Sequence, residues 1–234
     1  MKYNNIPHPE IKVSKICLGT MTWGNQNSEK EAFEQLDFSI DSGVNFIDTA
    51  ELYPVPAEAK TSGRTSEIIG KWLRQKKNRD KLVIATKIAG PGDYTKHIRT
   101  GGFSPKSIKD AINKRLKRLQ TDFLELYQLH WPERSTNFFG IRDYKHNYEE
   151  KWNDNFNEIL NSLDGFVKQG KIRNIGISNE KSWGAMRYIE ESNKCNLPRV
   201  VTIQNAYSLL NRPFEGDLAE ISVREGLGLS LIHI

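Results

Sequence analysis

Short apolar runs alternate with longer amphipathic segments along the chain. Strand-length runs of mainly aliphatic residues occur at 16–18, 44–47, 82–85, 123–129, 172–177 and 200–203. The segments between them repeat apolar residues at steps of three and four, which is the spacing of one helix face. A strand followed by a helix, repeated several times, is typical of parallel strands joined by crossover helices. The pattern therefore predicts an α/β fold.

Several of the expected helices have readable ends. Ser28 followed by Glu31 is a capping box, and Gly43 can end the same helix in the left-handed conformation. Ser104 before Pro105 begins another helix. Further helices are expected from Thr65 or Ser66, over 156–170, from Asn179 or Lys181, and over 215–225.

Polar residues stand at the carboxyl ends of the apolar runs. They are Asp48, Lys87, His130, Ser178, Asn179, Gln204 and Asn205. Singly, each has an ordinary structural explanation, such as a helix cap or a satisfied core histidine. Together they favour a barrel over a doubly wound sheet, because the carboxyl ends of barrel strands converge on the face where active sites lie. No GxGxxG follows the first strand, which also argues against the commonest doubly wound dinucleotide folds.

Composition narrows the class of protein. The 234 residues carry a net charge of +5, which we interpret as solvated helix faces because the Lys and Arg clusters follow helical spacing. No nucleic-acid-binding module, transmembrane segment or signal peptide is visible. Cys17 and Cys195 lie far apart and form no metal-ligand pattern. We expect one domain over residues 1–234, in the cytoplasm, with no metal, nucleic-acid or membrane partner.

Four of the residues near strand ends suggest a reaction. A tyrosine titrates near ~10, too high for efficient proton transfer at neutral pH, and an adjacent ammonium lowers that pKa. Lys87 can supply the ammonium to Tyr53, and Asp48 can hold the lysine. A neutral His130 can donate a hydrogen bond to a carbonyl oxygen. The set suits protonation of a carbonyl oxygen while hydride is transferred to the carbonyl carbon. None of the four residues can donate hydride, so a nicotinamide cofactor must supply it.

The same segments resemble the strand-end motifs of the aldo-keto reductase superfamily, over residues 3–228. The matching motifs are LGTMTWG, FIDTAELY, ATK, LYQLHWP, KIRNIGISN and TIQNAYSLLNR. The resemblance implies a (β/α)8 TIM barrel with an N-terminal hairpin, residues 3–12, across its bottom. It also implies an NADP(H)-dependent oxidoreductase that reduces aldehyde or ketone carbonyls to alcohols.

The resemblance implies roles for individual residues. Tyr53 is the proton donor, Lys87 lowers its pKa, Asp48 pairs with Lys87, and His130 orients the substrate carbonyl. The expected cofactor-binding residues are Gly19, Thr20, Met21, Asp48, Ser178, Asn179, Gln204 and Tyr207. Aromatic residues after strand ends either form an apolar substrate pocket or pack the loops together, and both interpretations stay open. These aromatics are Trp23, Trp131, Phe138 and Phe139, and the loops over 54–64 and 131–151 are the candidate walls.

The family pattern continues beyond this chain, and residues 230–234 depart from it. We therefore expect about seven strands, with the eighth strand and last helices missing, and with them the loops that hold the cofactor phosphates. A chain of this kind is expected to be poorly soluble or partly folded, because open strand edges lack partners, and to bind cofactor weakly. The alternatives are a cofactor-binding regulatory subunit similar to potassium-channel β-subunits, or an inert fragment. A hydrolase would leave Tyr53 and Lys87 without roles. The substrate, the preference for NADP over NAD and the oligomeric state stay open.

Overall fold

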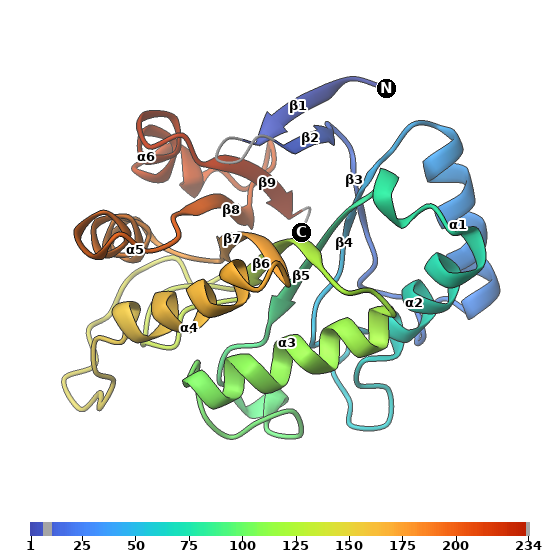
Figure 1. Ribbon diagram of the computed structural model, residues 1–234. Helices are drawn as coiled ribbons and strands as arrows, with labels where there is room; N and C mark the ends of the chain where they lie inside the picture. The colour runs from blue at the N-terminus through green and yellow to red at the C-terminus, as the bar shows by residue number, and fades with distance from the viewer. Residues whose placement is uncertain (7–10, 233–234) are drawn as a thin grey trace.

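The computed structural model describes residues 1–6 and 11–232, and a curled sheet of seven parallel strands lies at its centre (Figure 1). The strands are β3 (Cys17–Gly19), β4 (Phe46–Asp48), β5 (Val83–Ile88), β6 (Leu124–Leu129), β7 (Ile172–Ser178), β8 (Val200–Ala206) and β9 (Gly228–Ile232). They follow one another across the sheet in chain order. Within the described residues, β3 and β9 are its edge strands. The predicted α/β fold with about seven parallel strands is confirmed.

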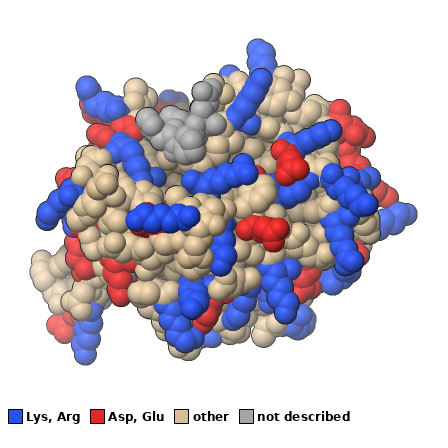
Figure 2. Space-filling view, in the orientation of Figure 1, with Lys and Arg blue, Asp and Glu red and all other residues tan. Residues whose placement is uncertain are grey.

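Helices cover the outer face of the sheet and pack side by side in chain order. They are α1 (Glu29–Asp41), α2 (Arg64–Lys76), α3 (Pro105–Leu119), α4 (Phe156–Lys168), α5 (Ser182–Cys195) and α6 (Leu218–Arg224). Three short 3-10 turns, η1 (Arg79–Lys81), η2 (Asp93–Thr95) and η3 (Pro213–Glu215), lie in the connections. The apolar stripes of these helices and the outward side chains of the strands form the main core. Lys and Arg are interspersed with Asp and Glu over the molecular face in Figure 2, as solvated helix faces require.

The predicted helix starts agree closely with the structure. Ser28 and Glu31 form both bonds of the capping box of α1, and Gly43 after that helix has φ +86°. α2 begins at Arg64, one residue before the earlier of its two predicted starts. α5 begins after Lys181, one of its two predicted starts. The last predicted helix, over 215–225, is shorter in the structure, where α6 covers Leu218–Arg224 and η3 ends at Glu215 just before it.

An N-terminal hairpin packs against one end of the inner face of the sheet. It consists of β1 (Tyr3–Ile6) and β2 (Ile11–Ser14), and residues 7–10 of the predicted hairpin lie outside the described residues. Asn45, just before β4, accepts a hydrogen bond from Ser14 N at 2.7 Å. Ile6 and Val13 form an apolar cluster with inward side chains of the strands; the strand members are Phe46, Val83, Ala85, Leu126 and Val201. The hairpin therefore closes the amino end of the sheet, where the resemblance placed it.

The C-terminal segment that departs from the family pattern joins the sheet. Ser230 pairs with Gln204, and Ile232 pairs with Ala206. Residues 233–234 of that segment lie outside the described residues. The segment thus continues β9 as far as the structure describes it.

Candidate active site

The inward side chains at the carboxyl end of the sheet are polar. Asp48 lies opposite Ala85, and Lys87, two residues further along β5, points to the same face. Lys87 lies opposite Gln128 of β6, and Ser178 lies opposite Gln204 of β8. Strand register therefore gathers these polar groups at the end opposite the hairpin.

Asp48 is the centre of the buried polar network. Its Oδ2 accepts a hydrogen bond from Lys87 Nζ, and its Oδ1 accepts from Gln128 Nε2 at 3.2 Å and Gln204 Nε2 at 3.1 Å. Lys87 Nζ also donates to Thr49 O at 3.1 Å. Because Asp48 and Lys87 are buried, the ion pair needs these additional partners to offset its loss of hydration.

Tyr53 lies beside this ion pair. Lys87 Nζ is 5.1 Å from the centre of the tyrosine ring, and Tyr53 is buried. Burial raises the pKa of Tyr53 above its ordinary value, and Lys87 is the largest opposing influence. The ammonium therefore acts in the direction expected from the sequence, but the net shift of the pKa is upward rather than downward, because loss of solvent disfavours the phenolate.

Lys87 remains protonated although it is completely buried. Burial by itself lowers the pKa of Lys87, but the charge and hydrogen bond of Asp48, joined by the charge of Tyr53 once that residue ionises, outweigh it, so the pKa lies above the usual value. The site therefore keeps a fixed ammonium next to a tyrosine hydroxyl.

His130 follows β6 and faces the same tyrosine. Its ring centre is 5.9 Å from that of Tyr53, with the rings nearly perpendicular. Burial, helped by the charge of Lys87, lowers the pKa of His130 well below its ordinary value, so the imidazole is neutral at pH 7. Its Nδ1 is buried and has no hydrogen-bond partner among the described residues.

The residues expected to bind the cofactor divide into three places. Ser178 Oγ donates to Gln204 O at 2.8 Å, and Asn179 Nδ2 donates to His130 O at 2.9 Å, so these residues lie beside the polar network. Thr20 is buried and its Oγ1 donates to Asp48 O at 2.9 Å. Gly19 and Met21 on either side of it are exposed at the edge of the sheet. Tyr207 lies beyond β8, and its hydroxyl donates to Glu215 Oε1 at 2.6 Å.

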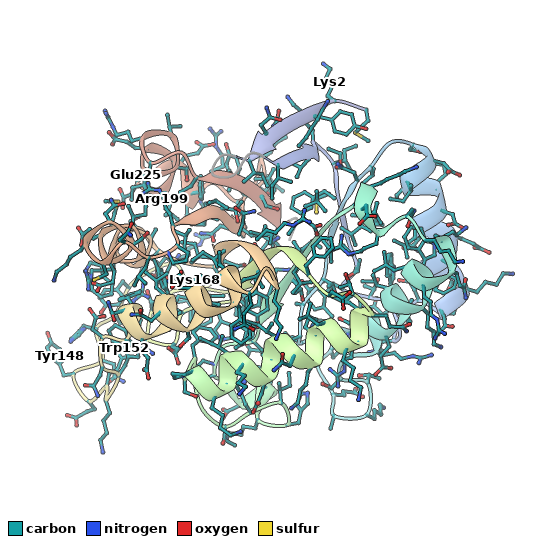
Figure 3. All side chains as sticks on the ribbon, viewed as in Figure 1. Lys2, Tyr148, Trp152, Lys168, Arg199 and Glu225 are labelled. Atoms are coloured by element: carbon teal, nitrogen blue, oxygen red, sulfur yellow. The ribbon has the colours of Figure 1, made fainter. Side chains whose placement is uncertain are left out.

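Three of the four aromatics expected around the substrate lie together. Trp131 packs against His130, with ring centres 4.7 Å apart, and Phe139 contacts both Trp131, at 5.6 Å, and Phe138, at 4.9 Å. Trp23 lies elsewhere, in the core under the helices, where its Nε1 donates to Gln35 Oε1 at 2.7 Å. The outer part of the long loop projects away from the sheet, with Tyr148 at its exposed tip (Figure 3).

Two residues of the site were missed in the sequence. Gln128 lies inside an apolar run, where a single polar residue facing inward is a usable signal. Tyr94, on η2, packs against Trp131 with ring centres 5.5 Å apart, and nothing in its loop sequence marks it. In the described part of the chain, no group of three or more His, Cys, Asp or Glu side chains could hold a metal ion. None of the helices described has the length and apolarity to cross a membrane.

Comparison with known proteins gives a consistent result. The sequence profile of the Aldo/keto reductase family matches residues 15–232. Protein tas of Escherichia coli is 48% identical over 98% of this chain, and the uncharacterized oxidoreductase YrpG of Bacillus subtilis is 36% identical over 98% of it. The chain spans 66% and 65% of the lengths of these relatives. A thermostable aldo-keto reductase solved with the inhibitor epalrestat superposes with a TM-score of 0.73 at 27% identity, covering 98% of this chain and 71% of the other.

Proposed function

Because this chain belongs to the aldo/keto reductase family, we propose that it carries the active site of an NADP(H)-dependent reductase of aldehyde and ketone carbonyls. The observation that carries the proposal is the placement of Tyr53 between the Lys87 ammonium and the neutral His130. The choice of NADP(H) over NAD(H) rests on the family resemblance. The cytoplasm remains the proposed location, and both cysteines are free thiols, as a reducing compartment allows.

The residues present fit the nicotinamide end of such a cofactor. Within the described ranges, Asn179 Oδ1 and Gln204 Oε1 accept no hydrogen bond, although both side chains are held in place through their nitrogens. Two fixed amide oxygens suit the amino group of a carboxamide. Ser178, Asn179 and Gln204 would hold that group, and the cofactor would supply hydride to the carbonyl carbon.

The chain's own residues handle the carbonyl oxygen. A neutral His130 donates a hydrogen bond that orients the oxygen, and the hydroxyl of Tyr53 gives it a proton as the carbon is reduced. Tyr53 is left as a phenolate, which the neighbouring Lys87 ammonium stabilises. Asp48 balances the charge of Lys87 and keeps its Nζ in place.

The test is a Tyr53→Phe variant of this chain, compared with the unsubstituted chain for NADPH-dependent reduction of a panel of aldehydes and ketones. Loss of the proton donor should lower kcat by about 10²-fold or more. The Kd for NADPH, from fluorescence titration, should change by less than about threefold, since the tyrosine contributes little to ground-state binding. Tyr3→Phe removes a hydroxyl at the hairpin end and should keep normal reduction.

Two results would contradict the proposal. Reduction by Tyr53→Phe at nearly the normal rate would show that another group donates the proton. Saturable NADPH binding without measurable reduction of any carbonyl by the unsubstituted chain would favour a cofactor-binding regulatory protein.

A further inference from the structure

The hydrogen-bond ladder between β4 and β5 continues past the end of β4 and then stops. Thr49 N donates to Ala85 O and Glu51 N donates to Lys87 O, each at 2.9 Å. The next bond of a parallel ladder would join Tyr53 N to Ala89 O. Tyr53 N donates instead to Ala50 O at 3.3 Å, so the chain turns back at this point. The turn brings Tyr53 over Lys87, but it leaves the backbone of Ala89 without its ladder partners.

Ala89 is fully buried, so its N–H and C=O both need replacement partners. Glu51 Oε2 accepts from Ala89 N at 3.0 Å, and Arg99 Nη1 donates to Ala89 O at 2.7 Å. Arg99 Nη2 also donates to Glu51 Oε1 at 2.6 Å. The two side chains thus complete the end of the ladder and form an ion pair in the same contact.

We propose that Glu51 and Arg99 are positioning residues that fix the turn carrying Tyr53 against Lys87. This inference rests on the proposed function, because it assigns the pair a role through the proton donor. The charged and titratable groups that face Tyr53 are Lys87 of β5, Asp48 of β4, the thiol of Cys17 on β3, and His130 after β6. Glu51 and Arg99 act on this set only by holding the backbone on which Tyr53 stands.

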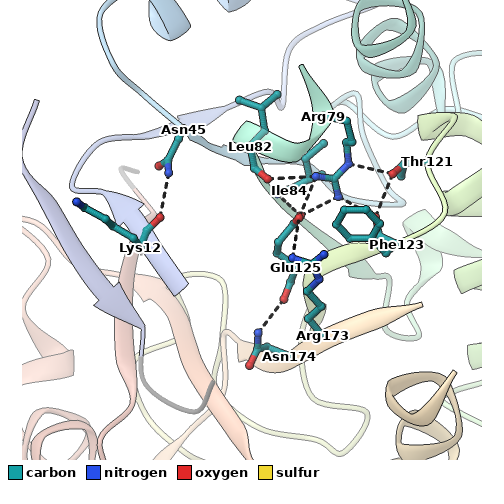
Figure 4. Close-up of polar contacts among 10 residues, drawn as sticks. All are labelled: Lys12, Asn45, Arg79, Leu82, Ile84, Thr121, Phe123, Glu125, Arg173 and Asn174. Carbon is teal, nitrogen blue, oxygen red and sulfur yellow. Dashed lines mark hydrogen bonds and ion pairs between the residues drawn. The ribbon is translucent and has the colours of Figure 1, made fainter. Parts of the chain in front are cut away.

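A matched pair lies at the opposite end of β5 (Figure 4). Glu125 Oε2 accepts from Ile84 N at 2.9 Å, and Arg79 Nη1 donates to Leu82 O at 3.1 Å and to Glu125 Oε1 at 2.9 Å. The side chains are similarly buried, with 15% and 4% exposed for Arg79 and Glu125 against 11% and 5% for Arg99 and Glu51. The Arg79–Glu125 pair therefore makes the same kind of contact at the end of the strand that is distant from Tyr53.

The experiment compares Glu51→Gln with Glu125→Gln in the full chain. Both substitutions should lower the urea midpoint by comparable amounts, because each removes a buried charge partner. Only Glu51→Gln should lower kcat for carbonyl reduction, by about 10- to 100-fold, because it displaces the proton donor. The KM for NADPH should stay within about twofold in both variants.

The ionisation of Tyr53 gives a readout that does not depend on turnover. In protein labelled with ¹³Cζ-tyrosine, with Tyr53→Phe identifying the resonance, Glu51→Gln should move the onset of Tyr53 ionisation to higher pH, because the hydroxyl loses the nearby ammonium. Arg99→Lys preserves the positive charge but cannot bond Ala89 O and Glu51 at the same time through two separate nitrogens. It should therefore raise the onset of Tyr53 ionisation by a smaller amount. This variant also serves if Glu51→Gln fails to fold.

Each outcome decides for or against the inference. Normal kcat and normal Tyr53 ionisation in Glu51→Gln, or in Arg99→Lys if that is the folded variant, would overturn it. An equal loss of kcat in Glu125→Gln would also overturn it, since the effect would then be general destabilisation. If Tyr53→Phe reduces carbonyls normally, the proposed function fails, while the NMR comparison still tests the positioning of Tyr53.

Discussion

The side chain of Asp48 illustrates how a charge is held inside this protein. One oxygen faces an ammonium, and the other accepts hydrogen bonds from two amides on different strands. The Asp48–Lys87 contact could be predicted because both residues stand at the carboxyl ends of neighbouring strands, where polar side chains converge. Gln204 was expected in the site and Gln128 carries a usable signal, but their shared hydrogen bonds to the second oxygen of Asp48 depend on the relative placement of three strands, which the sequence does not give.

His130 gives a prediction at the residue scale. Its pKa lies well below 6.5 in the folded chain, so between these two values the unfolded chain binds more protons than the folded one. Stability should therefore fall as the pH drops below 6.5, by as much as about 2 kcal/mol between pH 7 and pH 5. Urea unfolding at both pH values, followed by far-UV CD, measures this change.

Replacing His130 separates its contribution to the pH dependence of stability from that of the carboxylates. His130→Gln should lose less stability than the unsubstituted chain over the same pH interval, whatever its stability at pH 7. His97→Gln, at an exposed position, should keep the unsubstituted pH dependence. An unchanged pH dependence in His130→Gln would mean that the imidazole is protonated in the folded chain at pH 5.

At the scale of elements, helix starts were easier to predict than helix ends. The capping residues Ser28 and Ser104 act as expected, because a side-chain oxygen at the first turn leaves a local sequence signal. Gly43 has the expected positive φ, and Gly170, where another helix was predicted to end, also has a positive φ. Three other helices, however, end at residues that carry a side chain and still adopt φ near +50°; these are Lys77, Gln120 and Asn196. Asn is the usual alternative to glycine at such a position, so Asn196 carries a local signal, whereas Lys77 and Gln120 carry none.

The end of α2 provides a test of this local strain. Lys77 is exposed at φ 51°, a conformation that disfavours a side chain and suits glycine. Lys77→Gly should therefore stabilise the protein by about 0.5–1 kcal/mol in urea unfolding, after the greater unfolded-state entropy of glycine is deducted. Gln75→Gly, two residues earlier at an exposed position of the same helix, should destabilise it by about 0.5 kcal/mol. Equal losses in both variants would rule out relief of strain at Lys77.

For the molecule as a whole, alternating strands and helices were visible in the sequence because each element has its own hydrophobic period. The place of the N-terminal hairpin followed only from the family resemblance, since a short strand pair carries no signal of what it packs against. The separation of Trp23 from the other aromatics was not predictable either. A tryptophan after a strand has the same local sequence whether it faces a pocket or a helix.

The final prediction concerns the contribution of the hairpin to the stability of the whole molecule. Val13 is buried among inward side chains of the sheet, so Val13→Ala should lower the free energy of unfolding of the whole molecule by about 2 kcal/mol. Ile16→Ala, at a position that is 60% exposed, should change it by less than about 0.5 kcal/mol. Urea unfolding measures both. If Val13→Ala increased hydrogen exchange only at the hairpin amides and left the urea midpoint unchanged, the hairpin would unfold independently of the sheet.

Among the described residues, the apolar cluster beneath the hairpin and the polar network at the other end of the sheet draw on the same strands but have no side chain in common. An engineer can therefore treat them as separate targets. Mutant libraries at the loop aromatics Phe138, Phe139 and Tyr94, which pack with Trp131 or with one another, would leave the apolar cluster around Phe46, Val83 and Leu126 intact. Substitutions that aim at heat resistance are better placed at the hairpin end, because that cluster does not include Tyr53 or Lys87.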